Sequence, residues 1–167
     1  MKYKDFLNSA RKHKNTCDIL KKEVEVLIGR ESKNKARIKE LTINLYYLSG
    51  YVVECSIKYG IYYFIEYDRN KDIKDLDQNG LTFSGQIKNH KFERYSEYLN
   101  RHKGDIPLVS GFNGVSKEVK LLYKNWDADV RYLYSEIPIQ FRYCDSYVHV
   151  KDFNLKAEEI FSVVENM

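Results

Sequence analysis

Glu54 and Lys58 are two charged residues inside an otherwise apolar stretch that runs from Leu41 to Ile65. The stretch contains no proline, and its apolar residues recur at intervals of three and four, which is typical of a helix. Residues four positions apart lie on the same face of a helix, so this carboxylate and this ammonium group can pair. Because a buried charge is costly unless it is paired, the two residues predict a specific structural or chemical role.

Two further polar residues can join this pair. Arg131 lies at the edge of a second apolar helical pattern, where its guanidinium can pair with the Glu54 carboxylate, and His90 begins a short predicted helix. Together, Glu54, Lys58, His90 and Arg131 would form either a buried network that fixes the register of the helices or the floor of a binding cleft. We favour the network, because every member can be satisfied within the fold.

Other arrangements that carry chemistry are incomplete or absent in the sequence. The first half of a calcium-binding EF-hand loop is matched, but Gln86 stands where its bidentate glutamate is needed; the matching residues are Asp75, Asp77, Asn79 and Gly80. The chain has no glycine-rich phosphate loop, no Cys-x-x-Cys, no His-Glu-x-x-His and no nucleophile elbow. We therefore expect no bound metal and no cofactor.

The length of 167 residues fits one domain, 1–167, with a core that needs no disulfide. The three cysteines are widely spaced, and we expect reduced side chains in a cytoplasmic protein; they are Cys17, Cys55 and Cys144. His13 also lies on an apolar helix face, where a core histidine is favoured over a catalytic one. The central apolar stretch is long enough to cross a bilayer, but its two central charges make this unfavourable by several kcal/mol. There is no apolar signal segment at the N-terminus either, so we expect no membrane association.

Three features permit nucleic-acid contact without indicating it on their own. The formal net charge is +4, and the segment from Arg30 to Arg37 is a basic patch on a connection. The chain also has fifteen tyrosines, whose ordinary places are the core and interfaces, with base stacking as the alternative.

Helical periodicity recurs along the rest of the chain, and Ser116 fits the N-cap of one helix. The predicted helices span residues 3–27, 36–65, 90–99, 116–133 and from about 151 onward. The hydrophilic run after the central helix predicts a turn at Asn79-Gly80, and residues 81–87 fit an extended piece too brief to imply a sheet. Residues 137–141 fit either a short strand or a packed loop. These elements predict an all-α fold, an up-and-down bundle of four to five helices with two long loops.

The central segment YYLSGYVVECSIKYGI, residues 46–61, resembles the signature helix of the HEPN domain family. Four other segments resemble further parts of that family in the same order: YKDFLNSARKHKNTCDIL, NHKFERYSEYL, LYKNWDADVRY and FNLKAEEIFSVVENM. The resemblance covers nearly the whole chain and implies a HEPN-like helical domain. It does not fix the function, because the family includes ribonucleases, partners of nucleotidyltransferases and inactive modules.

The resemblance also implies a candidate active site. Active ribonucleases of the family use an Arg and a His separated by four to six residues near the start of the last helix, and Arg142 and His149 match with six residues between them. The imidazole would act as general base or acid in attack of the ribose 2′-hydroxyl on the phosphate, and the guanidinium would stabilise the developing charge. The match departs from the family pattern at Tyr143, where active members often carry a polar residue, and at Val150, where an aromatic residue is common.

Two functions follow from the resemblance. The first is a metal-independent endoribonuclease of a toxin–antitoxin or antiviral defence system, which cleaves RNA as a homodimer whose active cleft lies between the two copies. The second is a non-catalytic HEPN module that dimerises or binds a nucleotide or a partner protein, such as a neighbouring antitoxin or defence protein.

Overall fold

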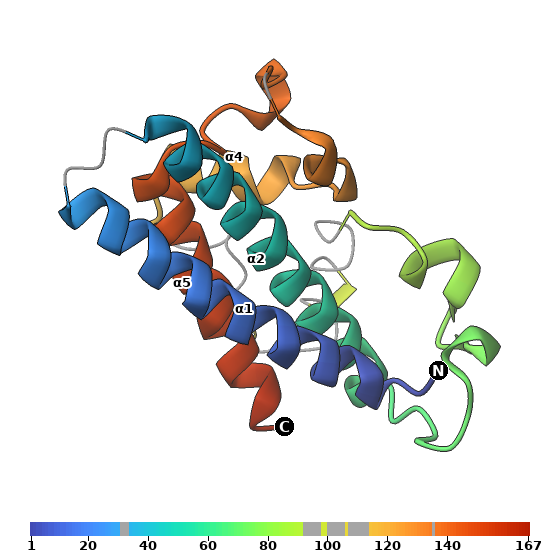
Figure 1. The fold of residues 1–167 in the computed structure, drawn as a ribbon. Coiled ribbons are helices and arrows are strands. Elements are labelled where there is room, and N and C mark those ends of the chain that lie inside the picture. The colour runs from blue at the N-terminus through green and yellow to red at the C-terminus, as the bar shows by residue number, and fades with distance from the viewer. Residues whose placement is uncertain (31–33, 92–97, 100–105, 107–113, 135) are drawn as a thin grey trace.

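Three long helices that lie side by side form the body of the protein (Figure 1). The computed structural model describes residues 1–30, 34–91, 98–99, 106, 114–134 and 136–167, and it is mostly helical, as predicted. The long helices are α1 (Lys4–Gly29), α2 (Lys35–Phe64) and α5 (Tyr147–Glu165). Ion pairs between Arg11 and Glu165 (2.9 Å) and between Glu25 and Lys151 (2.7 Å) join opposite ends of α1 and α5, so these two helices are antiparallel.

The central helix α2 is enclosed on all sides over much of its length. Every residue from 52 to 58 is buried, which is the pattern of a helix inside a core rather than one with a single apolar face. Asn34 caps the helix, because its side-chain oxygen accepts a hydrogen bond from the Arg37 backbone N–H at 3.0 Å. The sequence prediction of one long central helix is therefore confirmed.

The closing helix α5 packs one apolar stripe against α2. The stripe is fully buried and matches the sequence prediction; it consists of Phe153, Ala157, Ile160 and Val164. Between these residues, Asn154 donates a hydrogen bond to Ser49 Oγ of α2 at 3.0 Å. The helix begins at Tyr147, four residues earlier than predicted, and His149 therefore lies in its first turn.

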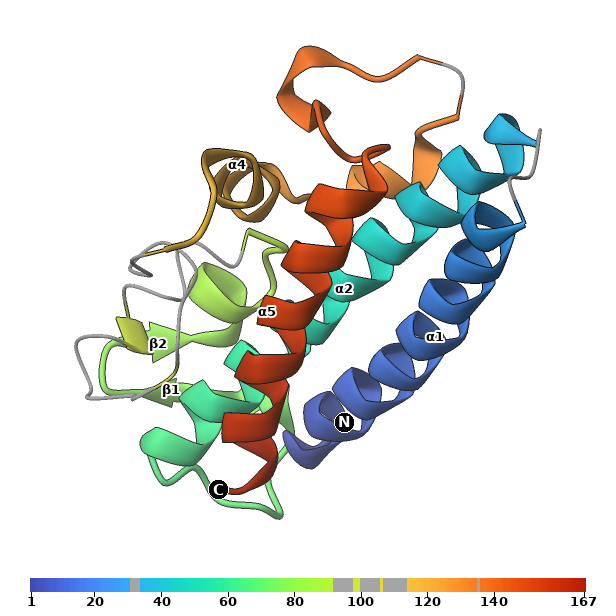
Figure 2. The ribbon, with the colours of Figure 1, turned by 90° about the vertical axis from the view of Figure 1, so that its left-hand side faces the viewer.

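The described parts of the chain between α2 and α5 lie on the side of these two helices that α1 leaves open (Figure 2). After α2 come a 3₁₀ turn, η1 (Ile73–Asp75), and a small antiparallel hairpin of β1 (Asp77–Gln78) and β2 (Leu81–Thr82). Asn79 and Gly80 form the hairpin turn with φ angles of 54° and 74°, so the predicted turn is confirmed. Residues 81–87 are not one extended piece, because after the two-residue strand the chain forms a π-helical turn, η2 (Phe83–Ile87).

The next helix, α4 (Lys117–Asn125), is shorter than predicted. Ser116 caps it as expected, with its hydroxyl accepting a hydrogen bond from the Val119 N–H at 3.2 Å. The helix ends before Trp126, whose backbone is extended, and Asp127 then starts a 3₁₀ turn, η4 (Ala128–Tyr132), by accepting a hydrogen bond from the Asp129 N–H at 3.1 Å.

Two other predictions concern the long connections. Residues 139–141 form a 3₁₀ turn, η5 (Ile139–Phe141), so the segment 137–141 is a packed turn and not a strand. The predicted helix 90–99 and the basic segment around Arg30 fall partly outside the described residues.

Candidate functional site

Glu54 and Lys58 of α2 come together with His90, and the Lys58 Nζ atom also lies 5.8 Å from the ring centroid of Phe6 on α1. The Lys58 Nζ atom lies 2.5 Å from Glu54 Oε1, and the His90 Nδ1 atom lies 3.2 Å and 3.3 Å from the two carboxylate oxygens. The side chains of Glu54 and Lys58 are only 3% and 7% exposed, whereas that of His90 is 50% exposed. An Nδ1–H donated to the carboxylate leaves the other ring nitrogen of His90 available on the outside.

Arg131 does not join this ion pair. Within the described residues, the ion-pair partners of Glu54 are Lys58 and His90, while Arg131 is exposed and its guanidinium lies 4.6 Å from the centroid of the Tyr132 ring. The expected pairing fails because the chain leaves the helical path at Asn125, so the 3₁₀ turn η4 carries Arg131 to a different position.

An aromatic shell covers the buried carboxylate. Tyr51 is its centre, with ring centroids 5.1 Å from Trp126, 5.0 Å from Tyr47 and 5.3 Å from His13. Burial, followed by a hydrogen bond to Tyr47, raises the pKa of Tyr51 well above its ordinary value. Tyr51 lies three residues before Glu54 and hence on the same side of α2, as the helical spacing of the sequence indicates. Sequence reasoning missed Trp126 as a member of this cluster.

The outer side of His90 lines a shallow pocket of about 470 Å³. Lys88, Lys91 and Asp127 also line it. The buried carboxylate is paired with Lys58 and His90, and of these three residues His90 lines the pocket. The two roles that the sequence left open, a structural network and the floor of a cleft, both stay predictions.

Arg142 and His149 both lie near the same aromatic ring, that of Tyr143. The Arg142 guanidinium carbon lies 5.6 Å from the Tyr143 ring centroid, and the His149 ring centroid lies 5.4 Å from it at an interplanar angle of 75°. Arg142 is exposed and His149 is half-buried. The sequence motif is thus a local cluster of three side chains, and Tyr143, first noted only as a departure from the family pattern, lies at its centre.

The backbone at Tyr143 explains how the chain forms this cluster. Its φ angle is 76°, in the left-handed region, which costs a non-glycine residue about 1–3 kcal/mol and is often found at functional sites. Two turns meet there, because the Cys144 N–H donates to the Phe141 carbonyl at 3.1 Å and the Ser146 N–H donates to the Tyr143 carbonyl at 3.0 Å. Cys144 is buried by this reversal, which raises the pKa of its thiol to about 12.

The cluster lies at the N-terminus of α5. The Ser146 side chain makes no capping hydrogen bond, and the first turn of the helix contains no acidic residue. Backbone N–H groups at such an end carry partial positive charge and favour anions. A guanidinium, an imidazole and a helix N-terminus at one place can hold a phosphodiester and move a proton beside it.

In the part of the chain that the structure describes, no group of three or more His, Cys, Asp or Glu side chains is placed to hold a metal ion. Among the described helices, none combines the length and the apolar character needed to span a bilayer. The chain gives no significant match to models of known protein families, to curated proteins or to solved structures.

Proposed function

We propose that this protein is a HEPN-type endoribonuclease that cleaves RNA without a metal ion and acts as a homodimer. Arg142 and His149 are the catalytic residues. The observation that carries the proposal is the contact of both side chains with the single Tyr143 ring, at the uncapped start of α5. This is the position at which the resemblance places an active-site pair.

The nucleophile in this reaction belongs to the RNA itself. The His149 imidazole accepts the proton of a ribose 2′-hydroxyl, and the 2′-oxygen then forms a bond to the adjacent phosphorus. The bond from phosphorus to the 5′-oxygen breaks, and the protonated imidazole returns its proton to that leaving oxygen. The products are a 2′,3′-cyclic phosphate and a 5′-hydroxyl end.

Arg142 has the electrostatic role in this scheme. Its planar fork of N–H donors holds two phosphate oxygens and stabilises the extra negative charge that develops during attack. The N-terminal amides of α5 add partial positive charge at the same place. Tyr143 orients both catalytic side chains, since each of them packs on its ring.

A second candidate is a non-catalytic HEPN module that binds a second copy, a nucleotide or a neighbouring antitoxin or defence protein. Two exposed apolar side chains on α1, Ile19 and Val26, favour it, because residues seven apart lie on one helix face and can join a protein interface. The two candidates share a biological setting, a toxin–antitoxin or antiviral system, and differ in whether RNA is cut.

The test is RNA cleavage in the presence of EDTA. Purified protein is incubated with total RNA, and Arg142→Ala and His149→Ala are each expected to lower the cleavage rate by roughly 10²-fold or more. Two controls are expected to keep the wild-type rate: Arg69→Ala, an exposed arginine beyond the other end of α2, and Val148→Ala, an exposed neighbour of His149.

Circular dichroism and light scattering show whether each variant keeps its fold and its oligomeric state. Undiminished cleavage in both catalytic variants would remove this site from the proposal. A wild-type protein that folds, dimerises and leaves RNA intact would favour the second candidate.

A further inference from the structure

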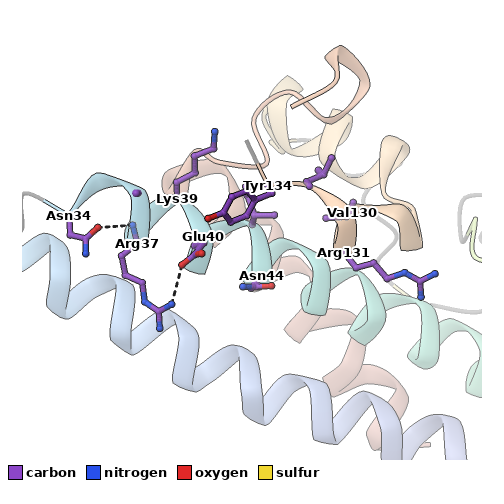
Figure 3. Close-up of a pocket in the computed structure, with 11 residues that line it drawn as sticks. Asn34, Arg37, Lys39, Glu40, Asn44, Val130, Arg131 and Tyr134 are labelled. Atoms are coloured by element: carbon purple, nitrogen blue, oxygen red, sulfur yellow. Dashed lines mark hydrogen bonds and ion pairs between the residues drawn. The ribbon is translucent and has the colours of Figure 1, made fainter. Parts of the chain in front are cut away.

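A pocket of about 570 Å³ lies between the start of α2 and η4 with the residues that follow it (Figure 3). Its volume falls within the range of about 300–1,000 Å³ that is usual for small-molecule sites. The polar and aromatic residues that line it include Arg37, Lys39, Glu40, Asn44, Arg131 and Tyr134. Its apolar floor includes Ile43 and Val130, both buried.

The charged residues of this pocket leave it with an excess of positive charge. Arg37 Nη1 lies 3.1 Å from Glu40 Oε2, so these two charges offset each other. The other charged lining residues are Lys39 and Arg131, which are both cationic. Figure 3 shows the Arg131 side chain at the edge of the pocket, extending along α2 away from Lys39 and Tyr134. The pocket therefore favours an anionic ligand.

Exposed aromatic rings accompany these cations. The Tyr134 ring lies across the start of α2 near Lys39 (Figure 3) and is 76% exposed. Tyr132, 71% exposed, carries the Arg131 guanidinium 4.6 Å from its ring centroid. Exposed aromatic rings beside basic side chains are the usual elements of single-stranded nucleic-acid sites, where bases stack on the rings and cations follow the phosphates.

The pocket lies at the same end of the molecule as the Arg142 and His149 cluster. The starts of α2 and α5 are close together in both views (Figures 1 and 2). A chain of nucleotides can thus extend from one site toward the other.

We propose that this pocket binds a nucleotide of single-stranded RNA that neighbours the scissile phosphate. The base stacks on Tyr134, while Lys39 and Arg131 contact the phosphates on either side of it. The identification of the ligand as RNA rests on the proposed function.

The test measures binding separately from cleavage. The probe is a fluorescein-labelled, single-stranded 2′-O-methyl RNA of ten nucleotides, which lacks the 2′-hydroxyl nucleophile, and its Kd is measured by fluorescence anisotropy. Tyr134→Ala is expected to raise the Kd roughly tenfold, whereas Tyr134→Phe, which keeps the ring, changes it less than about twofold. A plot of the logarithm of the binding constant against the logarithm of the salt concentration has a negative slope, and Lys39→Ala is expected to make it less steep by about 0.7. The control is Lys22→Ala, which replaces an exposed lysine on α1 and should leave the slope unchanged.

The outcomes separate the two proposals. Equal Kd values for Tyr134→Ala and wild type, no binding by the wild type, or equal loss in Tyr134→Phe and Tyr134→Ala would each overturn the pocket assignment. Preferred binding of duplex RNA would overturn it too. Loss of cleavage in Arg142→Ala together with normal RNA binding by Tyr134→Ala would support the proposed function and overturn the pocket assignment. Undiminished cleavage in Arg142→Ala together with weaker RNA binding by Tyr134→Ala would support the pocket and count against the proposed function.

Discussion

The indole nitrogen of Trp126 lies directly over Gly50 of the central helix. A β-carbon on Gly50 would be 1.8 Å from Trp126 Nε1, so no other residue type fits here while the ring stays in place. The indole N–H donates a hydrogen bond to the Tyr47 carbonyl at 3.2 Å. One glycine thus allows the segment after α4 to pack closely on α2, next to the aromatic shell around Glu54.

Replacing Gly50 by alanine should destabilise the fold. The methyl group would displace a buried ring that also holds a hydrogen bond, and overpacking of this kind costs about 1–3 kcal/mol or more. The measurement is urea denaturation followed by circular dichroism. Gly29→Ala is the matched control, because a β-carbon there would meet nothing within 4 Å, and its free energy of unfolding should be unchanged or slightly higher. Equal stabilities of the two variants would contradict the close packing at Gly50.

Removing one partner of the buried ion pair should be costly. Glu54→Gln leaves the Lys58 ammonium buried without its carboxylate, and the free energy of unfolding should fall by about 3–5 kcal/mol. The double variant Glu54→Gln/Lys58→Met removes the remaining buried charge and should recover most of this loss. A double-mutant cycle in urea measures the coupling between the two residues, and additive losses would mean that the pair is not coupled.

Stability should decrease in mild acid because of His13. Burial, followed by the neighbouring charge of Lys12, lowers the pKa of His13 below its ordinary value of 6.5. At pH values between the folded and unfolded pKa of His13, the unfolded chain binds more protons than the folded chain. The contribution of the neutral imidazole to the free energy of unfolding is therefore complete above about pH 6.5 and is lost as the pH falls below that value. The melting temperature of the wild type should therefore fall as the pH is lowered below about 6.5.

His13→Gln supplies the comparison for this pH effect. The variant removes the titrating group, which stacks on Tyr51 with ring centroids 5.3 Å apart, so its melting temperature should depend less steeply on pH. Its value at a pH near 8 measures the separate effect of the lost packing. Identical pH profiles for wild type and variant would assign the acid sensitivity to other groups.

The elements that periodicity can define were predicted well. The long helices α1 and α2 and the buried stripe of α5 follow from apolar residues three and four positions apart, because residues at that spacing share one face of a helix. Local chemistry was equally reliable, as Ser116 caps α4 and Asn79-Gly80 forms a turn. These features depend on interactions within a few residues of each other.

The end of α4 could not be predicted from the spacing of the apolar residues. Trp126 and Val130 continue the apolar pattern and are buried as expected. They do not lie on α4, however, because Trp126 is extended and Val130 belongs to the 3₁₀ turn that Asp127 starts. The predicted pairing of Arg131 with Glu54 was therefore wrong. The left-handed backbone conformation of Tyr143 could not be predicted from the sequence either, because an aromatic residue rarely adopts it and only the surrounding turns require it.

The packing of α5 against α2 has a consequence for biosynthesis. The neighbouring helices α1 and α2 can pair while the chain is still being made, because their contacts are close in sequence. The surface that receives Phe153 and Ile160 stays uncovered until α5 has left the ribosome. A nascent chain at that stage exposes an apolar surface to water, and we expect it to depend on a chaperone until α5 has been made.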